Sequence, residues 1–565
     1  MNSKKLLLVM TAVLVLFSLV LSSCGLIVIG GEKAETGETL PFDQPEGVDT
    51  GDAQSGETES TPNRGPEAPE TAADRAKKRV GALADLNFSG QSFIVATTSN
   101  MTFATDGDNY YDRVLLLRDS IVEEKYNIDI ITVFADEGRI ETDLRNAALS
   151  GDYYADLLSV SEYKIGRLAS EGLIMNLRSL PFYSTAQSYS RFSGEAAAGN
   201  AIYADIGAAS GDFSKIWAVF FNREIAEGLG YDLDLMVKDG EWTWDSFDRI
   251  SRKAADQLGI VGQGSAMMGN EYTDIVFRSG GERLVDNTLG KVPEISFNSE
   301  GIESLVHLSC NLIYGNPAAY KTASGATEDD FFSLFGSGQL LFAMAPLSCM
   351  SELSVLDVEW GVLPIPKVSE EQEHYYAYTE GTANVLAVPS ENNKFDMTGI
   401  IIGALNTASY ELLAEEYKTS CLYNYFRSIK AMRSMDAVLG SMTFDFSLLY
   451  SSGADLLANA TYGAVREART SVSDYATGLI NKRKEAANEQ LRRLFGEKTF
   501  DEDPIPLPSP EPVPEPEPEP EDTNLPENTE TEPEDTTAPS PEVTEGEHTE
   551  ALPDTDADTE DITEN

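Results

Sequence analysis

Histidine and cysteine are both scarce in this chain of 565 residues, which has 3 histidines and 4 cysteines. The histidines are His307, His374 and His548, which lie far apart in the sequence, and no Cys-x-x-Cys pair occurs. Zinc sites are built from closely spaced cysteine and histidine ligands. The sequence therefore argues against a zinc site, and we expect neither a metal site nor a cofactor.

Positive charge is the second shortage. The chain has 41 Lys and Arg residues against 94 Asp and Glu residues, which gives a formal net charge of -53. Nucleic acids and anionic membrane surfaces are bound through a basic protein face. This composition therefore excludes nucleic acid as an expected partner and argues against binding through an anionic lipid surface.

The end of the chain contains neither lysine nor arginine. Residues 501–565 lack Lys and Arg and include the run PEPVPEPEPEPED. A segment with so few large apolar residues cannot bury enough surface to fold, and alternating Pro and Glu favour an extended polyproline II conformation. We predict a disordered, acidic, Pro-rich tail over residues 498–565 that serves as a solvated spacer.

One long apolar run occurs at the N-terminus. It extends from Leu6 to Leu21, follows two lysines and ends in small residues, which is typical of a secretory signal. The sequence Leu-Ser-Ser-Cys that ends at Cys24 resembles the lipobox of bacterial lipoproteins, in which the cysteine is acylated. We predict a signal peptide over residues 1–23, lipidation at Cys24 and a chain anchored on the extracellular face of the bacterial cell membrane. An uncleaved spanning helix over Leu6–Ile29 is the alternative.

The segment after Cys24 has a distinct composition. An acidic tract rich in Gly, Thr and Pro covers residues 32–73, and we predict that residues 24–85 form a flexible linker between the lipid and the folded body.

The other cysteines are Cys310, Cys349 and Cys421, an odd number for an exported chain. Both one disulfide with one thiol and three buried thiols are open.

The folded body is predicted over residues 86–497. Its first third alternates short apolar runs with amphipathic segments, which is the pattern of βαβ units. The predicted strands are Gln91–Thr98, Ile128–Val133 and Ala155–Val160, and the predicted helices are Tyr110–Asn127 and Arg139–Ser150. This alternation predicts a parallel sheet with helices on both faces.

In a sheet of this kind, ligands bind beyond the carboxyl ends of the strands. The loops Thr97–Asn109 and Ser159–Lys164 follow two of these strands and are therefore candidate binding segments. A helix is predicted to begin at Thr243, whose hydroxyl can cap the first turn. The other predicted elements are strands at Ile216–Glu224 and Leu340–Met344 and helices at Ser299–Tyr314 and Glu328–Phe335.

Several stretches together resemble one family, the extracellular solute-binding proteins of bacterial ABC importers, in the sugar-binding group related to maltose-binding protein. The stretches are YADLLSVSEYKIGRLASEGLIMNL, AVFFNREIAEGLG, EWTWDSF, LFGSGQLLFAMAPLS, EWGVLPIPK and TEGTANVLAVPS. Ala155 stands where the family usually has a proline. Each stretch is weak alone, but their order and spacing cover nearly all of the body.

The resemblance implies an α/β fold of two lobes joined by crossing segments, the type II periplasmic-binding-protein fold. Such a chain is expected to be a monomer that is not an enzyme, to bind a carbohydrate between its lobes and to deliver it to an ABC transporter permease. Closure of the lobes is a hinge motion driven by the better contacts of the ligand in the closed form.

The resemblance also indicates candidate ligand contacts. They are Ser161 and Tyr163 after one strand, Lys215 and Trp217 at the entry to another, Ser348 after the Ala-Met strand, and Gly381 and Thr382 in the crossing loop. Sugars need flat aromatic surfaces and fixed polar groups. Where many relatives have an aromatic residue, this chain has Leu347-Ser348, which favours a ligand other than a long maltodextrin.

Each aromatic candidate has a packing alternative. Trp242 and Trp244 flank a helix start and are interpreted as packing residues, and Trp360 is also interpreted as core. Trp217 begins a buried-looking strand, so ligand contact and core packing are both open for it. Lys215 has the alternative of a surface charge.

Other functions remain open at this point. A peptide, a polyol or a uronate could replace the sugar, and a glycan-processing enzyme or a scaffold lipoprotein is a further alternative. Acidic pairs such as Asp152 and Asp156 could serve a glycosidase, although acidic residues are so frequent that pairs arise by chance. The sequence lacks the Gly-x-Ser-x-Gly, His-Glu-x-x-His and Gly-Lys-Ser/Thr motifs of common enzymes.

Overall fold

A computed structural model describes residues 70–265, 271–281, 285–295, 299–320, 327–379 and 381–450, together with Val465. The described residues belong to one compact unit that begins at Glu70. The predicted signal peptide (1–23), the lipidation at Cys24 and the predicted tail (498–565) lie outside the described residues. So do the first part of the predicted linker and the end of the predicted body.

The first sheet has the strand order β12-β3-β1-β2. Its strands are β1 (Gln91–Thr97), β2 (Ile128–Phe134), β3 (Leu157–Ser161) and β12 (Asn384–Ala387). β1 is parallel to β2 and β3, whereas β12 is antiparallel to β3. All five residues of β3 are buried, as expected for a strand covered on both faces. The predicted parallel sheet is confirmed, and it is completed by β12, whose residue Asn384 pairs with Ser161 of β3 from much later in the chain.

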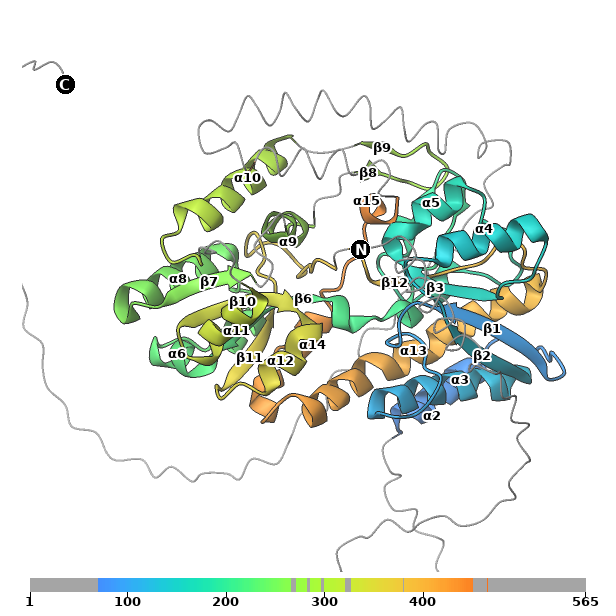
Figure 1. The fold of residues 1–565 in the computed structure, drawn as a ribbon, viewed down its shortest axis with the longest axis horizontal. Coiled ribbons are helices and arrows are strands. Elements are labelled where there is room, and N and C mark those ends of the chain that lie inside the picture. Colours follow the sequence, from blue (N-terminus) through green and yellow to red (C-terminus); the bar gives the residue numbers. More distant parts are fainter. Residues whose placement is uncertain are drawn as a thin grey trace, which may run out of the picture. The chain divides into compact units, whose positions relative to one another are not determined.

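Two of the helices around this sheet lie within one residue of their predicted bounds, at Tyr110–Tyr126 and Ile140–Ser150. The helices of this group are α2 (Ala72–Gly81), α3 (Tyr110–Tyr126), α4 (Ile140–Ser150), α5 (Ile165–Ser170) and the long α13 (Phe395–Asn424). Asn109 caps α3 by accepting a hydrogen bond from the backbone N–H of Asp112. The helix ends at Asn127, which has φ 50° in the left-handed region, a conformation that Asn tolerates better than most residues. Figure 1 shows α13 beside α2 and α3.

Helix α2 corrects one prediction. It lies inside residues 24–85, which were predicted to be a flexible linker, yet Thr71 and Asp74 form a capping box and Ala76 and Val80 are fully buried. Arg75 and Arg79 both bind the buried carboxylate of Glu411 on α13, at 2.8 and 2.7 Å. The prediction of a linker up to residue 85 is therefore wrong for this part, because the acidic composition hid a short helix with an apolar face.

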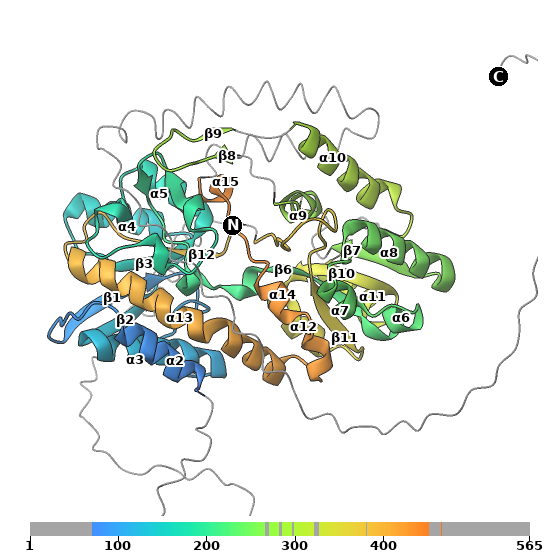
Figure 2. The same ribbon diagram turned by 180° about the vertical axis from the view of Figure 1, so that it is seen from behind.

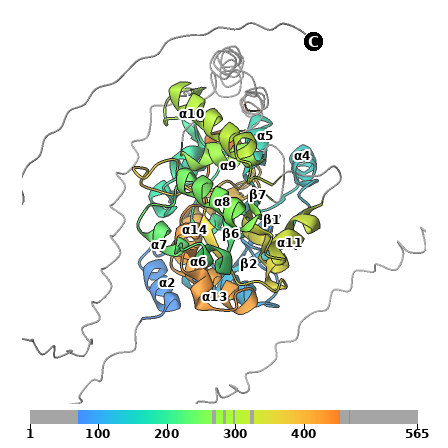
Figure 3. The same ribbon diagram turned by 90° about the vertical axis from the view of Figure 1, so that its left-hand side faces the viewer.

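The second sheet has the strand order β11-β6-β10-β7. Its strands are β6 (Trp217–Asn222), β7 (Val261–Ser265), β10 (Leu340–Pro346) and β11 (Trp360–Pro364). β6 is antiparallel to both β10 and β11, while β7 is parallel to β10. Figure 3 views this sheet from the side of helices α6, α8 and α11. The predicted α/β fold with two sheets is confirmed by this topology.

Helices and short hairpins complete the described part of the chain. The helices are α6 (Arg223–Gly228), α7 (Leu233–Lys238), α8 (Trp244–Leu258), α9 (Glu271–Ser279), α10 (Ser299–Cys310), α11 (Glu328–Gly336), α12 (Met350–Ser354), α14 (Met435–Leu439) and α15 (Phe446–Leu449). The short strands are β4 (Ala197–Ala198), β5 (Ala201–Ile202), β8 (Val285–Asp286) and β9 (Glu294–Ile295). Thr243 is the N-cap of α8 and accepts a hydrogen bond from the N–H of Ser246, which confirms the predicted helix start.

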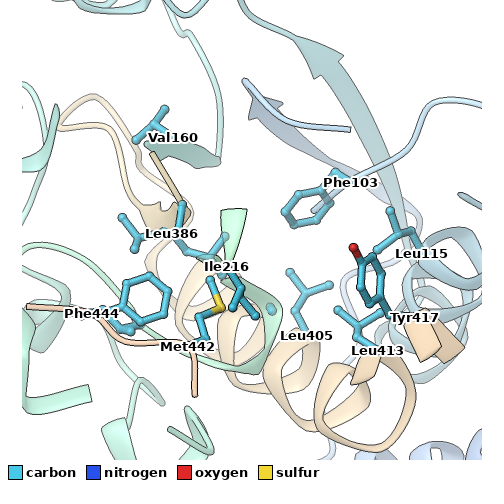
Figure 4. Packing of buried hydrophobic residues seen from close by; sticks show 14 of the residues in the cluster. Phe103, Leu115, Val160, Ile216, Leu386, Leu405, Leu413, Tyr417, Met442 and Phe444 are labelled. Carbon is cyan, nitrogen blue, oxygen red and sulfur yellow. The ribbon is translucent and has the colours of Figure 1, made fainter. Parts of the chain in front are cut away.

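The chain passes between the two sheets several times. One segment leads from β5, on the side of the first sheet, to β6 of the second sheet, and another returns from β11 to β12. A third segment leads from α14 to α15 (Figure 2). The passing segments pack together, since Ile216, Met442 and Phe444 belong to the same hydrophobic cluster as Val160 of β3 and Leu386 of β12 (Figure 4). The segments at the junction are therefore packed into the same hydrophobic core as the first sheet.

The tryptophans and cysteines resolve two open points. Trp242 and Trp244 are fully buried and Trp360 is 5% exposed, so all three pack in the core as interpreted. The indole N–H of Trp242 donates to the carbonyl of Pro364 at 2.8 Å, which satisfies its polar atom. Cys310, Cys349 and Cys421 are all thiols in the described structure, rather than one disulfide and one thiol.

No helix in the described ranges is both long enough and apolar enough to span a membrane.

Candidate functional site

A cavity of about 330 Å³ lies where the first sheet meets the segments that pass between the sheets. Its lining comes from the loops after β1, β2 and β3, from the segment before β6 and from the start of β12. The lining residues are Thr98, Ser99, Asn100, Met101, Glu137, Ser161, Tyr163, Asp212, Ser214, Lys215, Thr382 and Asn384. This is the carboxyl edge of the parallel strands, where the topology predicts a ligand.

Asp212 contributes a carboxyl group to one wall of the cavity. The residue is fully buried, and its two carboxylate oxygens accept hydrogen bonds from the hydroxyls of Ser99 at 2.8 Å and Ser214 at 2.5 Å. Burial raises the pKa of Asp212, while the two hydroxyls and the nearby charge of Lys215 oppose that rise. The loop after β1 is thereby fastened to the segment that enters β6.

Asn384, the first residue of β12, forms a second polar junction. Its side-chain amide donates to the carbonyl and the hydroxyl of Ser159, both at 3.0 Å, and to the hydroxyl of Thr98 at 3.3 Å. The hydroxyls of Ser159 and Thr102 are 2.8 Å apart in the same buried network. These bonds fix the start of β12 against β1 and β3, so the cavity wall is preorganised.

Glu137 and Tyr163 form the outer rim. The phenol of Tyr163 donates to Oε1 of Glu137 at 2.9 Å, and the ammonium of Lys164 lies 3.6 Å from the same oxygen and 4.8 Å from the centre of the Tyr163 ring. Burial raises the pKa of the Tyr163 phenol, so the group stays protonated near neutral pH and remains a donor. Tyr163 is 38% exposed and offers the one aromatic ring in the cavity lining.

The structure brings four of the seven predicted contacts together. Ser161, Tyr163, Lys215 and Thr382 line the cavity. Gly381 stands behind the wall, where its carbonyl accepts a hydrogen bond from the N–H of Tyr163 at 3.1 Å. Its φ of 69° requires a residue without a side chain at this turn.

The other two predicted contacts do not line this cavity. Ser348 lies in the short helical turn after β10, is exposed, and its carbonyl accepts a hydrogen bond from Ser351. Trp217 is fully buried in the hydrophobic cluster of the second sheet. The expected ligand contact of Trp217 is therefore corrected in favour of its alternative, because the strand that it begins is buried along its whole length.

Sequence reasoning missed eight lining residues. They are Thr98, Ser99, Asn100, Met101, Glu137, Asp212, Ser214 and Asn384. The first four lie in the loop Thr97–Asn109, which the sequence had already indicated as a binding segment. Glu137 follows β2, and the rule that ligands bind after parallel strands would have included it. Asp212 carried no sequence signal, because its position depends on how the chain leaves the first sheet.

Neither a protein-family model nor a curated protein sequence matches this chain. Among solved structures, the cyclic alpha-maltosyl-1,6-maltose binding protein from Arthrobacter globiformis is similar, with a TM-score of 0.48 and 13% identity over 72% of this chain and 99% of that one. The maltose-binding periplasmic protein from Listeria monocytogenes in complex with maltose has a TM-score of 0.48 and 10% sequence identity. The match covers 71% of this chain and 98% of that one. The GacH receptor of Streptomyces glaucescens, solved in complex with acarbose, has a TM-score of 0.45 and 13% sequence identity. The match covers 72% of this chain and 99% of that one.

The described residues contain no group of three or more His, Cys, Asp and Glu side chains placed to hold a metal ion. The carboxylates near the cavity have other partners. Glu137 binds Tyr163, and Asp212 binds two serine hydroxyls. The chemistry that this lining supports is hydrogen bonding to a polar molecule.

A buried carboxyl group lies directly behind the cavity, between Ser161 and Tyr163. Glu162 is fully buried; its Oε1 accepts a hydrogen bond from the hydroxyl of Thr379 at 2.8 Å, and its Oε2 has no hydrogen-bond partner. Burial raises the pKa of Glu162 to about 8, with smaller opposing effects from Thr379 and from the charge of Arg278, while Asp445 raises it further. The group is therefore protonated in the folded chain at neutral pH.

We expect Glu162→Gln to remove a pH dependence of stability. The folded pKa of about 8 exceeds the ordinary value of 4.5, so the folded chain binds the proton more tightly than the unfolded chain. The stability from this proton is complete below about pH 4.5 and is lost as the pH rises to about 8. The variant should match the parent at pH 5 and exceed it by a few kcal/mol at pH 9.

Thermal melts of parent and variant between pH 5 and pH 9 measure this difference. Glu124→Gln is the matched control, because Glu124 is exposed on α3. Parent and Glu162→Gln curves that stay parallel across this range would show that the Glu162 carboxyl is already ionised in the folded chain.

Proposed function

We propose that this protein is an extracellular binding protein that binds a carbohydrate and delivers it to an ABC transporter permease. Hydroxyl, amide and carboxylate groups of the cavity lining form hydrogen bonds with the carbohydrate. The observation that carries the proposal is the cavity at the carboxyl edge of the first sheet. Its walls come from three strand-following loops and from two segments that pass between the sheets, so a hinge motion between the sheets changes the cavity.

The chemistry of the lining supports a polyhydroxylated ligand. The hydroxyls of Ser99 and Ser214 donate to Asp212 and can accept from a ligand, Asn100 offers an amide group, Asn384 offers its amide oxygen, and the carboxylate of Glu137 accepts. Tyr163 supplies a partly exposed ring for the apolar C–H face of a sugar. The cavity volume of about 330 Å³ is at the lower end of ordinary ligand sites, which suits one or two sugar rings of an oligosaccharide.

The remaining parts of the proposal rest on sequence. The lipobox-like sequence at Cys24 supports a lipid anchor at the cell surface, and the resemblance to importer binding proteins supports a permease as partner. A monomer suffices for this role. A peptide, a polyol or a uronate is the alternative ligand.

We expect a sugar to raise the melting temperature of a soluble chain, residues 25–565, in a thermal-shift screen. A ligand that binds only the folded state stabilises it by about 2.7 kcal/mol at a hundredfold excess over the dissociation constant. The screen contains mono- and oligosaccharides, with peptides and polyols as the competing classes. Product analysis of each hit tests for turnover, which would indicate a glycan-processing enzyme instead.

A pair of variants links the shift to the cavity. Asn100 is exposed and lines the cavity, so Asn100→Ala should reduce the shift while leaving the melting temperature of the ligand-free chain nearly unchanged. Asn424 is exposed at the end of α13, outside the lining, and Asn424→Ala is the control. A shift by peptides alone, or an equal shift in both variants, contradicts the proposal.

A further inference from the structure

The hairpin β8–β9 comes from the side of the second sheet and packs on the first. The helices before and after it, α9 and α10, belong to the hydrophobic cluster of the second sheet through residues such as Ile275 and Val306. Val285 of β8 belongs instead to the cluster of the first sheet and is 4% exposed, and Leu289 packs against that same cluster. Figures 1 and 2 show β8 and β9 between α10 and α5. The chain therefore crosses to the first sheet after α9 and returns before α10.

Polar bonds fasten the tip of this hairpin to the side of the first sheet. Asn287 is 1% exposed. Its side-chain amide donates to three backbone carbonyls at 3.0, 3.0 and 3.1 Å, those of Gly194, Glu195 and Ala197. The N–H of Gly290 donates to the carbonyl of Gly199 at 2.8 Å. Because buried polar groups are costly unless they are bonded, this contact is specific to the segment around β4.

A buried ion pair joins the two sides at a second point. The guanidinium of Arg278 on α9 is 3.0 Å from the carboxylate of Asp445 and 3.1 Å from the hydroxyl of Ser447. Asp445 is the N-cap of α15. Phe446 and Leu449 of this helix pack in the cluster of the first sheet. The side chains of Arg278 and Asp445 are only 14% and 15% exposed, so either charge is costly without the other.

Rotation of the second sheet away from the first has to break these contacts. An ion pair requires its charged atoms to lie within about 4 Å of each other, so a small separation of α9 from α15 is enough to lose it. The connections of the hairpin also leave little slack. The chain spans at most about 21 Å from Ser279 to Val285 and about 14 Å from Ile295 to Ser299. A hairpin that stayed on the first sheet would therefore restrict the hinge motion.

We propose that the hairpin β8–β9 and Arg278 form a clasp that holds the two sheets in the described arrangement and has to release before the second sheet can rotate. The inference goes beyond carbohydrate binding, because it concerns the contacts that restrain the hinge. It can be tested without a ligand.

Spin labels on the two sides measure the release. Leu149 on α4 and Leu258 on α8 are 82% and 51% exposed, so cysteines at these positions can carry the labels. Cys310→Ser removes the one described thiol that is not buried. The soluble parent chain should give one main distance between the labels. Asn287→Ala and Arg278→Met should each add a longer distance, with a population at least about tenfold above that in the parent.

Matched controls have buried contacts of the same kind on one side only. The side-chain amide of Asn392 donates to the carbonyl of Asp156 and to the hydroxyl of Thr398, both at 2.9 Å and both on the side of the first sheet. Arg223 pairs with Asp234 on the side of the second sheet. Asn392→Ala and Arg223→Met should lower stability without adding the longer distance.

Hydrogen exchange at Gly290 tests whether the two contacts act together. The N–H of Gly290 is bonded to the first-sheet side, whereas Arg278 lies on α9. Release of the clasp as a unit predicts that Arg278→Met speeds exchange at Gly290 at least about tenfold, and that Arg223→Met leaves it unchanged. If neither clasp variant folds, the parent in rising urea should lose protection at Gly290 before it loses protection in β3.

The outcomes separate the clasp from the proposed function. A longer distance and faster exchange at Gly290 in the clasp variants, with neither change in the controls, supports the inference. A single unchanged distance in the folded clasp variants overturns it, since the passing segments alone would then hold the sheets. The longer distance in the controls as well, or loss of protection at Gly290 only together with β3, also overturns it. A thermal-shift screen without a sugar hit contradicts the carbohydrate function and leaves the clasp standing.

Discussion

Replacing Trp217 with alanine is expected to lower the free energy of unfolding by about 3–5 kcal/mol, the usual range for a large aromatic side chain in a core. Trp217 is fully buried and belongs to the same cluster as Val219 of its own strand and Phe342 of the neighbouring β10. Its backbone N–H donates to the carbonyl of Tyr378 in the segment that returns to the first sheet. The cavity left by the indole would therefore open at the junction of the two sheets.

Urea unfolding measures this effect, and a binding titration on the fraction that remains folded separates stability from affinity. Tyr423→Ala is the control, because Tyr423 is 76% exposed on α13 and its loss should change stability little. A Trp217→Ala protein of unchanged stability but reduced affinity would restore Trp217 as a ligand contact.

Arg223→Met is expected to cost a similar amount, about 3–5 kcal/mol, because it leaves a buried carboxylate without its cation. The guanidinium of Arg223 is 2.9 Å from the carboxylate of Asp234, and the two side chains are 3% and 5% exposed. Arg223 also donates to the carbonyl of Lys430 at 3.1 Å, and the hydroxyl of Ser434 donates to Asp234 at 2.7 Å. The pair joins α6, α7 and the segment after α13.

A double-mutant cycle tests this explanation. Asp234→Leu combined with Arg223→Met removes both charges, so the double variant should recover most of the loss measured for Arg223→Met alone. Urea unfolding of the four proteins gives the coupling between the two side chains. The surface pair Arg252 and Asp248, whose side chains are 36% and 27% exposed, is the control and should show a coupling below about 1 kcal/mol. Additive losses at Arg223 and Asp234 would mean that packing, and not charge, holds this junction.

Much of the first sheet could be predicted from sequence because its signals are local. The alternation of apolar runs and amphipathic helices gave strands at Gln91–Thr98 and Ile128–Val133, and the structure places β1 and β2 within one residue of those bounds. Thr243 was recognised as a cap from its hydroxyl and its position before a helical pattern. Strand β12 was reached only through the resemblance, since its pairing with β3 joins residues more than 200 positions apart.

The cavity was predicted in place but less well in composition. Strand-following loops are identified by topology, and the loop Ser159–Lys164 does line the cavity through Ser161 and Tyr163. Burial is a property of tertiary packing, so no local pattern could decide between the two interpretations of Trp217. Asp212 and Glu137 were missed for a different reason: they are two of 94 acidic residues, and no local pattern distinguishes them from the others. The fold alone places both of them in the lining of one cavity.

The packing of α2 has a mechanical consequence. With the lipid anchor proposed at Cys24, the tether enters the body at Thr71, and α2 is fastened to α13 by ion pairs of Arg75 and Arg79 with Glu411. Contacts of α2 with α3 and α13 tie it to the first sheet. The first sheet would thus be held near the membrane by the anchor. The hinge motion on ligand binding would then be a rotation of the second sheet relative to the first.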